Sequence, residues 1–392
     1  QVLLASSVRM LARGRRRQPR RFNVLAQLNV GLLLAQLAFL AAPWKHLAAR
    51  RPSGKVAPPP PVRRIPAPEL LAKCRAALSD AGLEEGACGP VAASIVAAQR
   101  DGKTAHGLGR LNAMVASVAS GEVFGQAKPS LAMCAPAVVR VDARTGFVHP
   151  AIALGIAPLV AAAREHGVAM LSVVNCRGII GSLWFHLETI AAEHGLLAIG
   201  CCNSPAFVAQ EGGRRRIFGT NPFGYAWPRP DNLLPLVADF ACSKVARGEI
   251  QQAARRGGNV PSDWAVAADG APTTDPKLAL AGTQTVFGGH KGSALALLVE
   301  LLGAALGGTD LAIAGGGSSE AGGMNRGLTL IAIDPTRQSP EALRHAELLL
   351  SAMAEERGTR LPSAARYAAR AKAEERGIAV EENLLQQCFG TE

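Results

Sequence analysis

The spacing of apolar residues predicts alternating helices and strands along most of the chain. Apolar positions three and four residues apart indicate a first helix after Pro68. The same spacing indicates further helices over residues 91–99, 151–165, 183–193, 340–356 and 363–375. Short apolar runs indicate strands over residues 138–143, 168–174, 196–202, 235–240 and 328–333. Alternation of this kind is typical of a layered α/β fold around a buried sheet.

A glycine-rich loop precedes the longest nearly unbroken apolar run. The loop reads Gly288-Gly289-His290-Lys291-Gly292, and the run continues to residue 302. Apolar residues lie on almost every face of this run, which predicts a buried helix. Unpaired N–H groups and the positive end of the helix dipole lie at its start, and Lys291 adds a charge, so the pattern predicts an anion-binding site. A simple glycine-rich turn before a core helix, with Lys291 in solvent, explains the pattern equally well.

The composition is that of a globular protein and limits what the chain binds. Its 392 residues suffice for one large α/β domain or two smaller ones, and 48% apolar and 18% charged residues exclude a disordered chain. The net charge of +12 comes from residues 1–64, which hold thirteen Lys and Arg and no Asp or Glu. The other 29 basic residues face 30 acidic ones, so we expect no nucleic-acid partner.

Residues 1–64 differ in pattern from the rest of the chain. They combine a basic cluster over 13–21, an uncharged stretch over 22–44 and a proline-rich linker over 57–62. The uncharged stretch could span a bilayer, for which roughly 20 residues are needed, but four Asn and Gln side chains weaken it. We interpret residues 1–64 as a helical, non-catalytic extension and residues 65–392 as the catalytic domain.

The extension has three alternative explanations: a membrane anchor, an organellar presequence, or upstream sequence that was translated in error. We expect membrane contact only if residues 22–44 are retained and insert. The catalytic domain itself is expected in the cytoplasm, and eight scattered cysteines without a C-x-x-C pair are typical of a reducing compartment.

Three charged residues near predicted element ends are candidates for chemistry. His106 lies in a loop of small residues before a helix that is predicted to begin near Gly109, where an imidazole could exchange a proton near neutral pH. Arg110 follows four residues later and would share its face on a helix. Asp239 ends the strand over 235–240, where a carboxylate is either a helix N-cap or a catalytic group. A lone loop histidine is more often simply exposed, so the pattern alone does not assign a role.

The remaining motifs are mostly informative by their absence. The turn Gly219-Thr220-Asn221-Pro222 offers backbone N–H groups and two polar side chains, although an ordinary turn explains it as well. No G-x-G-x-x-G follows a strand, and no P-loop, G-x-S-x-G or H-E-x-x-H occurs. No His and Cys spacing indicates zinc, so we expect no metal site.

An ordered set of motifs resembles the malate/L-lactate dehydrogenase-like oxidoreductases. The set comprises Asp101-Gly102, His106-Gly107, Arg110-Leu111, Val141-Asp142-Ala143-Arg144-Thr145-Gly146-Phe147, Phe218-Gly219-Thr220-Asn221-Pro222, Pro272-Thr273-Thr274-Asp275-Pro276, Gly288 to Gly292 and Arg360-Leu361-Pro362. The resemblance runs from about residue 66 to near the C-terminus. It implies a three-layer, non-Rossmann α/β fold with a mixed sheet, an intertwined homodimer, and reduction of 2-keto acids or cyclic imino acids with NADH or NADPH.

Further segments are similar to one subgroup of that family. Ser182-Leu183-Trp184 with Glu188, Tyr225-Ala226-Trp227-Pro228-Arg229-Pro230 and Gly292-Ser293-Ala294-Leu295-Ala296 look like those of the Δ1-piperideine-2-carboxylate/Δ1-pyrroline-2-carboxylate reductases. This likeness implies NADPH-dependent reduction of a cyclic imine to L-pipecolate or L-proline, with NADH as a possible second cofactor.

The resemblance also implies roles for individual residues. His106 matches the family's acid/base histidine, Arg110 its contact to the substrate carboxylate, and Asp239 a residue that orients the histidine or the amine. The cofactor contacts that it implies are Gly219, Thr220, Asn221, Val237, Ala238, Asp239, His290, Lys291 and Gly292.

The chain departs from the family pattern at two places. Ala105 stands where relatives usually have Ser, and Asn175-Cys176-Arg177-Gly178 stands where they often read Asn-Ser-His-His. Two alternatives to the imino-acid reductase therefore remain: a 2-hydroxy-acid dehydrogenase of the malate, lactate or ureidoglycolate type, and a weakened pseudoenzyme tethered to a membrane by residues 22–44.

Overall fold

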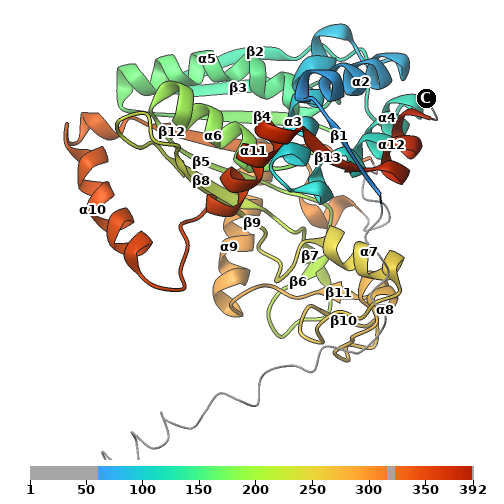
Figure 1. The fold of residues 1–392 in the computed structure, drawn as a ribbon. Helices are drawn as coiled ribbons and strands as arrows, with labels where there is room; N and C mark the ends of the chain where they lie inside the picture. The colour runs from blue at the N-terminus through green and yellow to red at the C-terminus, as the bar shows by residue number, and fades with distance from the viewer. Residues whose placement is uncertain (1–60, 316–322, 391–392) are drawn as a thin grey trace, which may run out of the picture. The chain divides into compact units, whose positions relative to one another are not determined.

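The computed structural model describes residues 61–315 and 323–390, and a seven-stranded sheet runs through the middle of this part (Figure 1). In spatial order the strands are β2 (Ser130–Ala135), β3 (Val138–Asp142), β4 (Val168–Cys176), β12 (Arg326–Ile333), β5 (Leu197–Cys202), β8 (Phe223–Trp227) and β9 (Leu236–Phe240). β3 and β4 run parallel, whereas the other neighbours in this sheet run antiparallel. The predicted mixed sheet is therefore confirmed.

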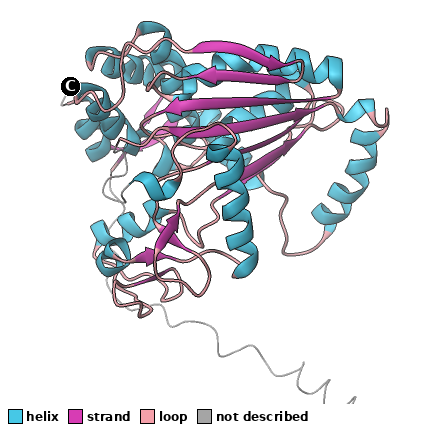
Figure 2. Ribbon diagram, turned by 180° about the vertical axis from the view of Figure 1, so that it is seen from behind, coloured by secondary structure: helices cyan, strands magenta, loops and turns pink. Residues whose placement is uncertain are grey.

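Helices cover both faces of this sheet and make the fold three-layered. α5 (Val148–His166) packs on β3 and β4, and α6 (Leu183–His194) packs on β5, β8 and β9. Seen from the other side in Figure 2, the strands lie in front of these helices. The opposite face carries α9 (His290–Glu300) and the π-helical turn Leu301–Ala305. Alternating residues of β12 serve the two faces, because Leu328 and Leu330 lie in the core under α5 and α6 while the Thr329 hydroxyl donates to the Leu302 carbonyl at 2.7 Å.

A helical group lies beside the sheet and holds the N-terminal end of the described chain. It consists of α2 (Ala67–Asp80), α3 (Glu85–Arg100), α4 (Leu111–Ala119) and α12 (Glu382–Phe389). A two-stranded ribbon of β1 (Val62–Ile65) and β13 (Ile378–Glu381) joins it antiparallel, so the folded part takes in residues 62–64, which the sequence analysis assigned to the extension. Residues 1–60, including the stretch 22–44, lie outside the described residues.

A second, small sheet forms a lobe below β9. Its strands, in spatial order, are β10 (Ala265–Val266), β11 (Thr283–Gln284), β6 (Val208–Ala209) and β7 (Arg216–Phe218). α7 (Arg247–Arg256) and α8 (Pro276–Ala281) cover it around a core that includes Ile250 and Ala279. Two C-terminal helices complete the fold, α10 (Ala342–Glu355) and α11 (Ala364–Arg376).

The apolar run after residue 288 forms a helix, but the prediction that it is buried all round is wrong for this chain. Small residues of α9, including Gly292 and Ala296, face the protein, whereas Leu297, Leu298 and Leu301 are 50%, 42% and 50% exposed. The sequence of a leucine-rich helix does not show whether its outer face packs against this chain or against another molecule. Within residues 61–315 and 323–390, no helix has both the length and the apolar character needed to cross a bilayer.

Candidate functional site

The loop that carries His106 and Arg110 is built from two 3₁₀ turns after α3, Thr104–His106 and Leu108–Arg110. Buried Gln99 holds it, because its Oε1 accepts from Leu108 N at 3.1 Å and its Nε2 donates to Ala379 O at 3.1 Å. Gly107 permits this contact, since a Cβ there would lie 2.6 Å from Gln99 Oε1. The loop therefore presents His106 and Arg110 from a fixed backbone.

His106 and Arg110 influence each other electrostatically. The Arg110 side chain donates from Nε to the Ala105 carbonyl at 2.8 Å, which keeps the guanidinium close to the loop. Burial, and then the charges of Arg110 and Lys103, lower the pKa of His106 to about 4. His106 is therefore a neutral imidazole at pH 7, able to accept a hydrogen bond or take up a proton.

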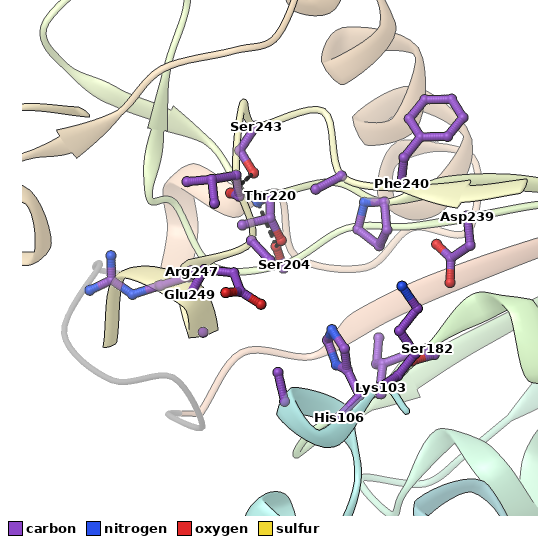
Figure 3. A pocket seen from close by; sticks show the side chains of 18 of the residues that line it. Lys103, His106, Ser182, Ser204, Thr220, Asp239, Phe240, Ser243, Arg247 and Glu249 are labelled. Atoms are coloured by element: carbon purple, nitrogen blue, oxygen red, sulfur yellow. Dashed lines mark hydrogen bonds between the residues drawn. The ribbon is translucent and has the colours of Figure 1, made fainter. Parts of the chain in front are cut away.

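Asp239 is the second-last residue of β9 and points its carboxylate toward the side chains of Lys103 and His106 (Figure 3). Its Oδ2 accepts from the backbone N–H of Trp184 at 3.0 Å, at the start of α6. Burial raises its pKa, while the Trp184 N–H and the Arg366 charge act in the opposite direction. The predicted residues His106 and Arg110 thus line one cavity together with Asp239, which lies more than 100 positions later in the sequence.

Hydroxyl groups form another wall of this cavity, away from His106 (Figure 3). Ser204 Oγ accepts from Thr220 N at 2.9 Å and lies 3.3 Å from Thr220 Oγ1. Gly219 is required beside them, because a Cβ would come within 2.2 Å of Ser204 Oγ. Ser243, which comes shortly after β9, also lines the cavity, and its hydroxyl donates to Val245 O at 2.7 Å.

The cavity has a volume of about 740 Å³, within the usual range for small-molecule sites. Five cationic side chains line it, Lys103, Arg110, Lys244, Arg247 and Arg326, against two carboxylates, Asp239 and Glu249. Aromatic surface comes from Trp184, Phe240 and Phe287. Positive charge, hydroxyls and aromatic surface fit an anionic dinucleotide and a small acid. No group of three potential metal ligands occurs within residues 61–315 and 323–390.

Most residues predicted to contact the cofactor do not reach this cavity in the chain. Thr220 and Asp239 line it, but Gly219, Asn221, Val237 and Ala238 lie behind them. The Asn221 side chain is fully buried, because it donates to Ala296 O at 3.1 Å and to Glu300 Oε1 at 2.8 Å. The side chains of Asn221 and Val237 therefore pack inside the protein, and their predicted contacts to a cofactor stay a prediction.

The glycine-rich loop at the start of α9 also lies outside the lining. Gly288 and Gly289 have φ of 58° and 62°, and a Cβ on Gly292 would come within 1.9 Å of Phe287 O, so the glycines are needed for the turn itself. His290 and Lys291 are exposed, and Phe287 is the residue of this segment that lines the cavity.

Sequence reasoning missed four cations that line the cavity, of which Lys244 follows directly after Ser243. Lys103 stands between two motif residues of its own loop, which was a usable signal. Arg247 starts α7 and stacks over the Phe207 ring, its guanidinium carbon 4.0 Å from the ring centre. Arg326 begins β12, two residues before the apolar run that predicted this strand, and nothing local marks it.

The two departures from the family pattern have structural explanations. Ala105 offers its carbonyl to Arg110, a contact that any residue could make. Arg177 donates from Nε to Asn325 Oδ1 at 3.0 Å, outside the cavity. Gly178, with φ of 70°, sits against Phe147 and Val123, where a Cβ would lie 2.6 Å from the Phe147 ring.

Comparisons with known proteins agree on one family. A sequence model described as malate/L-lactate dehydrogenase matches residues 65–388. Δ(1)-pyrroline-2-carboxylate reductase from Ancylobacter novellus is 42% identical over 335 residues, which cover 83% of this chain and 96% of that protein. (2R)-3-sulfolactate dehydrogenase (NADP(+)) from Chromohalobacter salexigens is 38% identical over 310 residues, 78% of this chain and 90% of that protein.

A solved structure is similar over the same region. The crystal structure of Δ1-piperideine-2-carboxylate reductase from Pseudomonas syringae pvar. tomato aligns with a TM-score of 0.78 at 34% identity. The alignment covers 83% of this chain and 99% of that one.

Proposed function

The chain belongs to the malate/L-lactate dehydrogenase family of oxidoreductases, whose chemistry uses a nicotinamide cofactor, and we propose that it reduces cyclic imino acids with NADPH. The products would be L-proline from Δ1-pyrroline-2-carboxylate or L-pipecolate from Δ1-piperideine-2-carboxylate. The observation that carries this proposal is the meeting of His106, Arg110 and Asp239 in one cation-rich cavity.

The residues of the cavity suit an iminium acid. Arg110 would bind the substrate carboxylate and orient the C=N bond. The Asp239 carboxylate would stabilise the positive charge of the protonated imine, and neutral His106 would accept a hydrogen bond from its N–H. A reduced nicotinamide, when bound, supplies the hydride that converts the iminium to a neutral secondary amine, so no proton has to come from the protein in that step.

A 2-keto acid would make a different demand on His106. Its oxygen becomes an alkoxide on reduction and needs a proton from an acid nearby. Because the pKa of His106 is lowered to about 4, only a small fraction of this imidazole is protonated at pH 7. This supports an imine rather than a keto acid as the substrate at neutral pH.

The cofactor would be held on the hydroxyl wall. Thr220 and Ser243 lie on the side of the cavity away from His106 and would offer hydroxyl groups to a dinucleotide. Lys244 also lines the cavity and adds a positive charge. The surplus of cationic over anionic side chains in the lining favours the additional phosphate of NADPH over NADH. His290 and Lys291, at the exposed start of α9, remain proposed contacts to a part of the cofactor that extends from the cavity.

A substrate panel tests this proposal. The purified full chain should oxidise NADPH with Δ1-pyrroline-2-carboxylate or Δ1-piperideine-2-carboxylate, and more slowly with pyruvate or oxaloacetate; the same panel with NADH ranks the cofactors. Turnover of keto acids alone would reject the imino-acid assignment. Nucleotide binding without turnover of any acid would identify a pseudoenzyme.

His106→Ala is the matching variant. We expect kcat to fall about tenfold while the Kd of NADPH changes little, because the imidazole accepts a hydrogen bond from the imine N–H and transfers no proton. His166→Ala, at the C-terminal end of α5 and outside the cavity, is the control and should keep full activity.

A second candidate function uses the same cavity. The likeness to a sulfolactate dehydrogenase and the five cationic side chains both suit a 2-hydroxy acid with two negative groups. Reduction of 3-sulfopyruvate, added to the panel, would separate this candidate from the imino-acid reductase.

We further propose that the chain is a homodimer. Leu297, Leu298 and Leu301 expose one apolar face of α9 and its π-helical turn. α10, which stands clear of the sheet in Figures 1 and 2, exposes Leu348 and Leu349 to 70% and 65%. Exposed apolar surface of this extent is typical of a face that a partner covers.

A further inference from the structure

Arg326 is a buried cation at the sheet side of the cavity. It is the first residue of β12, opposite Cys176 at the end of β4, and β5 ends beside it at Cys202. Only 5% of Arg326 is exposed, yet it is among the residues that line the cavity. The guanidinium is therefore shielded on most sides and opens toward the space in which we place the substrate.

Arg326 has no ion-pair partner among residues 61–315 and 323–390. Arg326 Nε is buried without a hydrogen-bond partner, and none of the carboxylates in residues 61–315 and 323–390 lies within ion-pair distance of its guanidinium. Burial raises the pKa of the Cys176 thiol to about 11 and that of Cys202 still further, so both thiols are neutral at pH 7. Glu122 acts on Arg326 electrostatically, but its own burial raises its pKa and weakens that support.

The other buried arginines near the cavity are arranged differently. Arg370 contacts the carboxylates of Asp101 and Glu188, and Arg366 lies 3.2 Å from Glu188 Oε2 and stacks on the Trp184 ring. A guanidinium taken out of water is costly unless an anion and hydrogen bonds offset the lost hydration. Among the described residues, Arg326 has no ion-paired carboxylate to offset the lost hydration. Its buried charge therefore points to an anion from outside the chain.

We propose that Arg326 binds the carboxylate of the acid in the cavity, together with Arg110. This rests on the proposed function for the identity of the acid, although the required chemistry is only that of a delocalised oxyanion. A guanidinium presents its donors in a planar fork that matches two carboxylate oxygens. Arg326 would approach the acid from the sheet and Arg110 from the loop, which leaves His106 and Asp239 for the imine nitrogen.

The test measures binding of an unreactive carboxylate, so that it does not depend on turnover. The probe is pyrrole-2-carboxylate, a planar acid without a reducible C=N bond, titrated calorimetrically into the full chain loaded with NADP⁺. Arg326→Met should raise its Kd about tenfold or more, because a charged hydrogen-bonding pair is lost, and should change the Kd of NADP⁺ less than about twofold. Arg326→Lys keeps the charge but not the planar set of donors, so its Kd for pyrrole-2-carboxylate should lie between those of the parent chain and Arg326→Met.

Stability separates this role from a structural one. Because Arg326 is uncompensated in the unliganded chain, Arg326→Met should leave its Tm unchanged or raise it, and should abolish the rise in Tm that pyrrole-2-carboxylate causes in the parent chain. Arg177→Met is the matched control, since Arg177 is held by Asn325 outside the cavity. It should keep the affinity for the probe.

Three results would overturn the inference: no binding of the probe by the parent chain, an unchanged Kd in Arg326→Met, or a lowered Tm of the unliganded variant. Weaker NADP⁺ binding with unchanged probe binding would also overturn it, and would assign the oxyanion to a cofactor phosphate. Probe binding through Arg326 in a chain that reduces no imino acid would reject the proposed function and leave the inference standing.

Discussion

Arg370 of α11 holds the carboxylate of Asp101, donating from Nε to Oδ1 at 3.1 Å and from Nη2 to Oδ2 at 2.5 Å. Asp101 is almost completely buried and stands immediately before the loop that carries Lys103 and His106. Arg370 also donates from Nη1 to Glu188 Oε1 of α6 at 2.5 Å. One side chain near the C-terminus therefore ties the loop that carries His106 to the helix whose first turn binds Asp239.

Arg370→Met should destabilise the fold and disturb the site together. The substitution takes one cationic partner from each of two buried carboxylates, although Asp101 keeps Arg100 and Glu188 keeps Arg366, so a loss of about 3 kcal/mol in the free energy of unfolding is expected. The loop should also loosen, so kcat/KM should fall even at temperatures where the variant is folded. Urea unfolding and steady-state kinetics measure the two effects.

Arg376→Met serves as the control for Arg370, because Arg376 on the same helix pairs with Glu375 in solvent. An exposed pair of this kind contributes little, and the variant should stay within about 0.5 kcal/mol of the parent chain. Equal losses in both variants would mean that the buried network does not hold the loop.

Asp239→Asn tests the charge at the end of β9. Asparagine keeps an acceptor for the Trp184 N–H, so the turn should survive, but the charge opposite the iminium is removed. We expect kcat/KM to fall about 10²-fold with little change in the Kd of NADPH. Because burial raises the pKa of Asp239, the neutral side chain should not lower the Tm.

The control for Asp239 is Asp231→Asn, in an exposed turn after β8. It should leave kinetics and Tm unchanged. Retention of full activity by Asp239→Asn would exclude an electrostatic role for this carboxylate and would require another counter-charge for the imine.

The spacing of apolar residues predicted those helices and strands whose apolar face is long and regular. α2, α5, α6, β4 and β12 lie within a few residues of their predicted bounds, because each has a continuous periodic face buried on one side. β8 was missed because it contains Gly224 and is flanked by turn residues. The small sheet was missed because β6, β10 and β11 are each two residues long.

Some residues of the candidate site could likewise be predicted from the sequence, and others could not. His106, Arg110 and Asp239 could be predicted because they stand at element ends within recognisable segments. Arg326 could not, since its proposed role depends on β12 lying between β4 and β5, a pairing between residues about 125 to 165 positions apart. Val237 and Asn221 were assigned to the cofactor from the family resemblance, and a matched segment does not reveal which of its side chains face the cavity.

Acid should destabilise the fold through two buried histidines. His149 of α5 and His186 of α6 are buried with ring centres 5.8 Å apart, and burial lowers their pKa values to about 4 and about 3. The unfolded chain takes up protons near pH 6.5, whereas the folded chain resists until lower pH. The free energy of unfolding should therefore fall as pH drops below about 6.5, by about 3 kcal/mol for His149 alone by pH 4.

His186→Leu isolates this effect. It removes one of the two titrating groups from the core, so its free energy of unfolding, measured in urea at pH 7 and pH 5, should drop less than that of the parent chain. His345→Leu, at an exposed position on α10, should follow the parent. Identical pH dependence in His186→Leu and the parent would show that other groups govern acid unfolding.

The exposed leucines of α9 predict how the chain assembles. Light scattering after size exclusion should give the parent chain about twice its mass of 40.6 kDa. Leu297→Glu together with Leu301→Glu places two charges on the face that we assign to the partner, where desolvating them would cost several kcal/mol, so the variant should elute as a monomer.

Leu278→Glu is the matched control, because Leu278 on α8 is 51% exposed in the other lobe, and this variant should remain dimeric. A parent chain that is monomeric at micromolar concentration would contradict the dimer, and a dimer that survives both charges would place the interface elsewhere, with the outer face of α10 as the next surface to test.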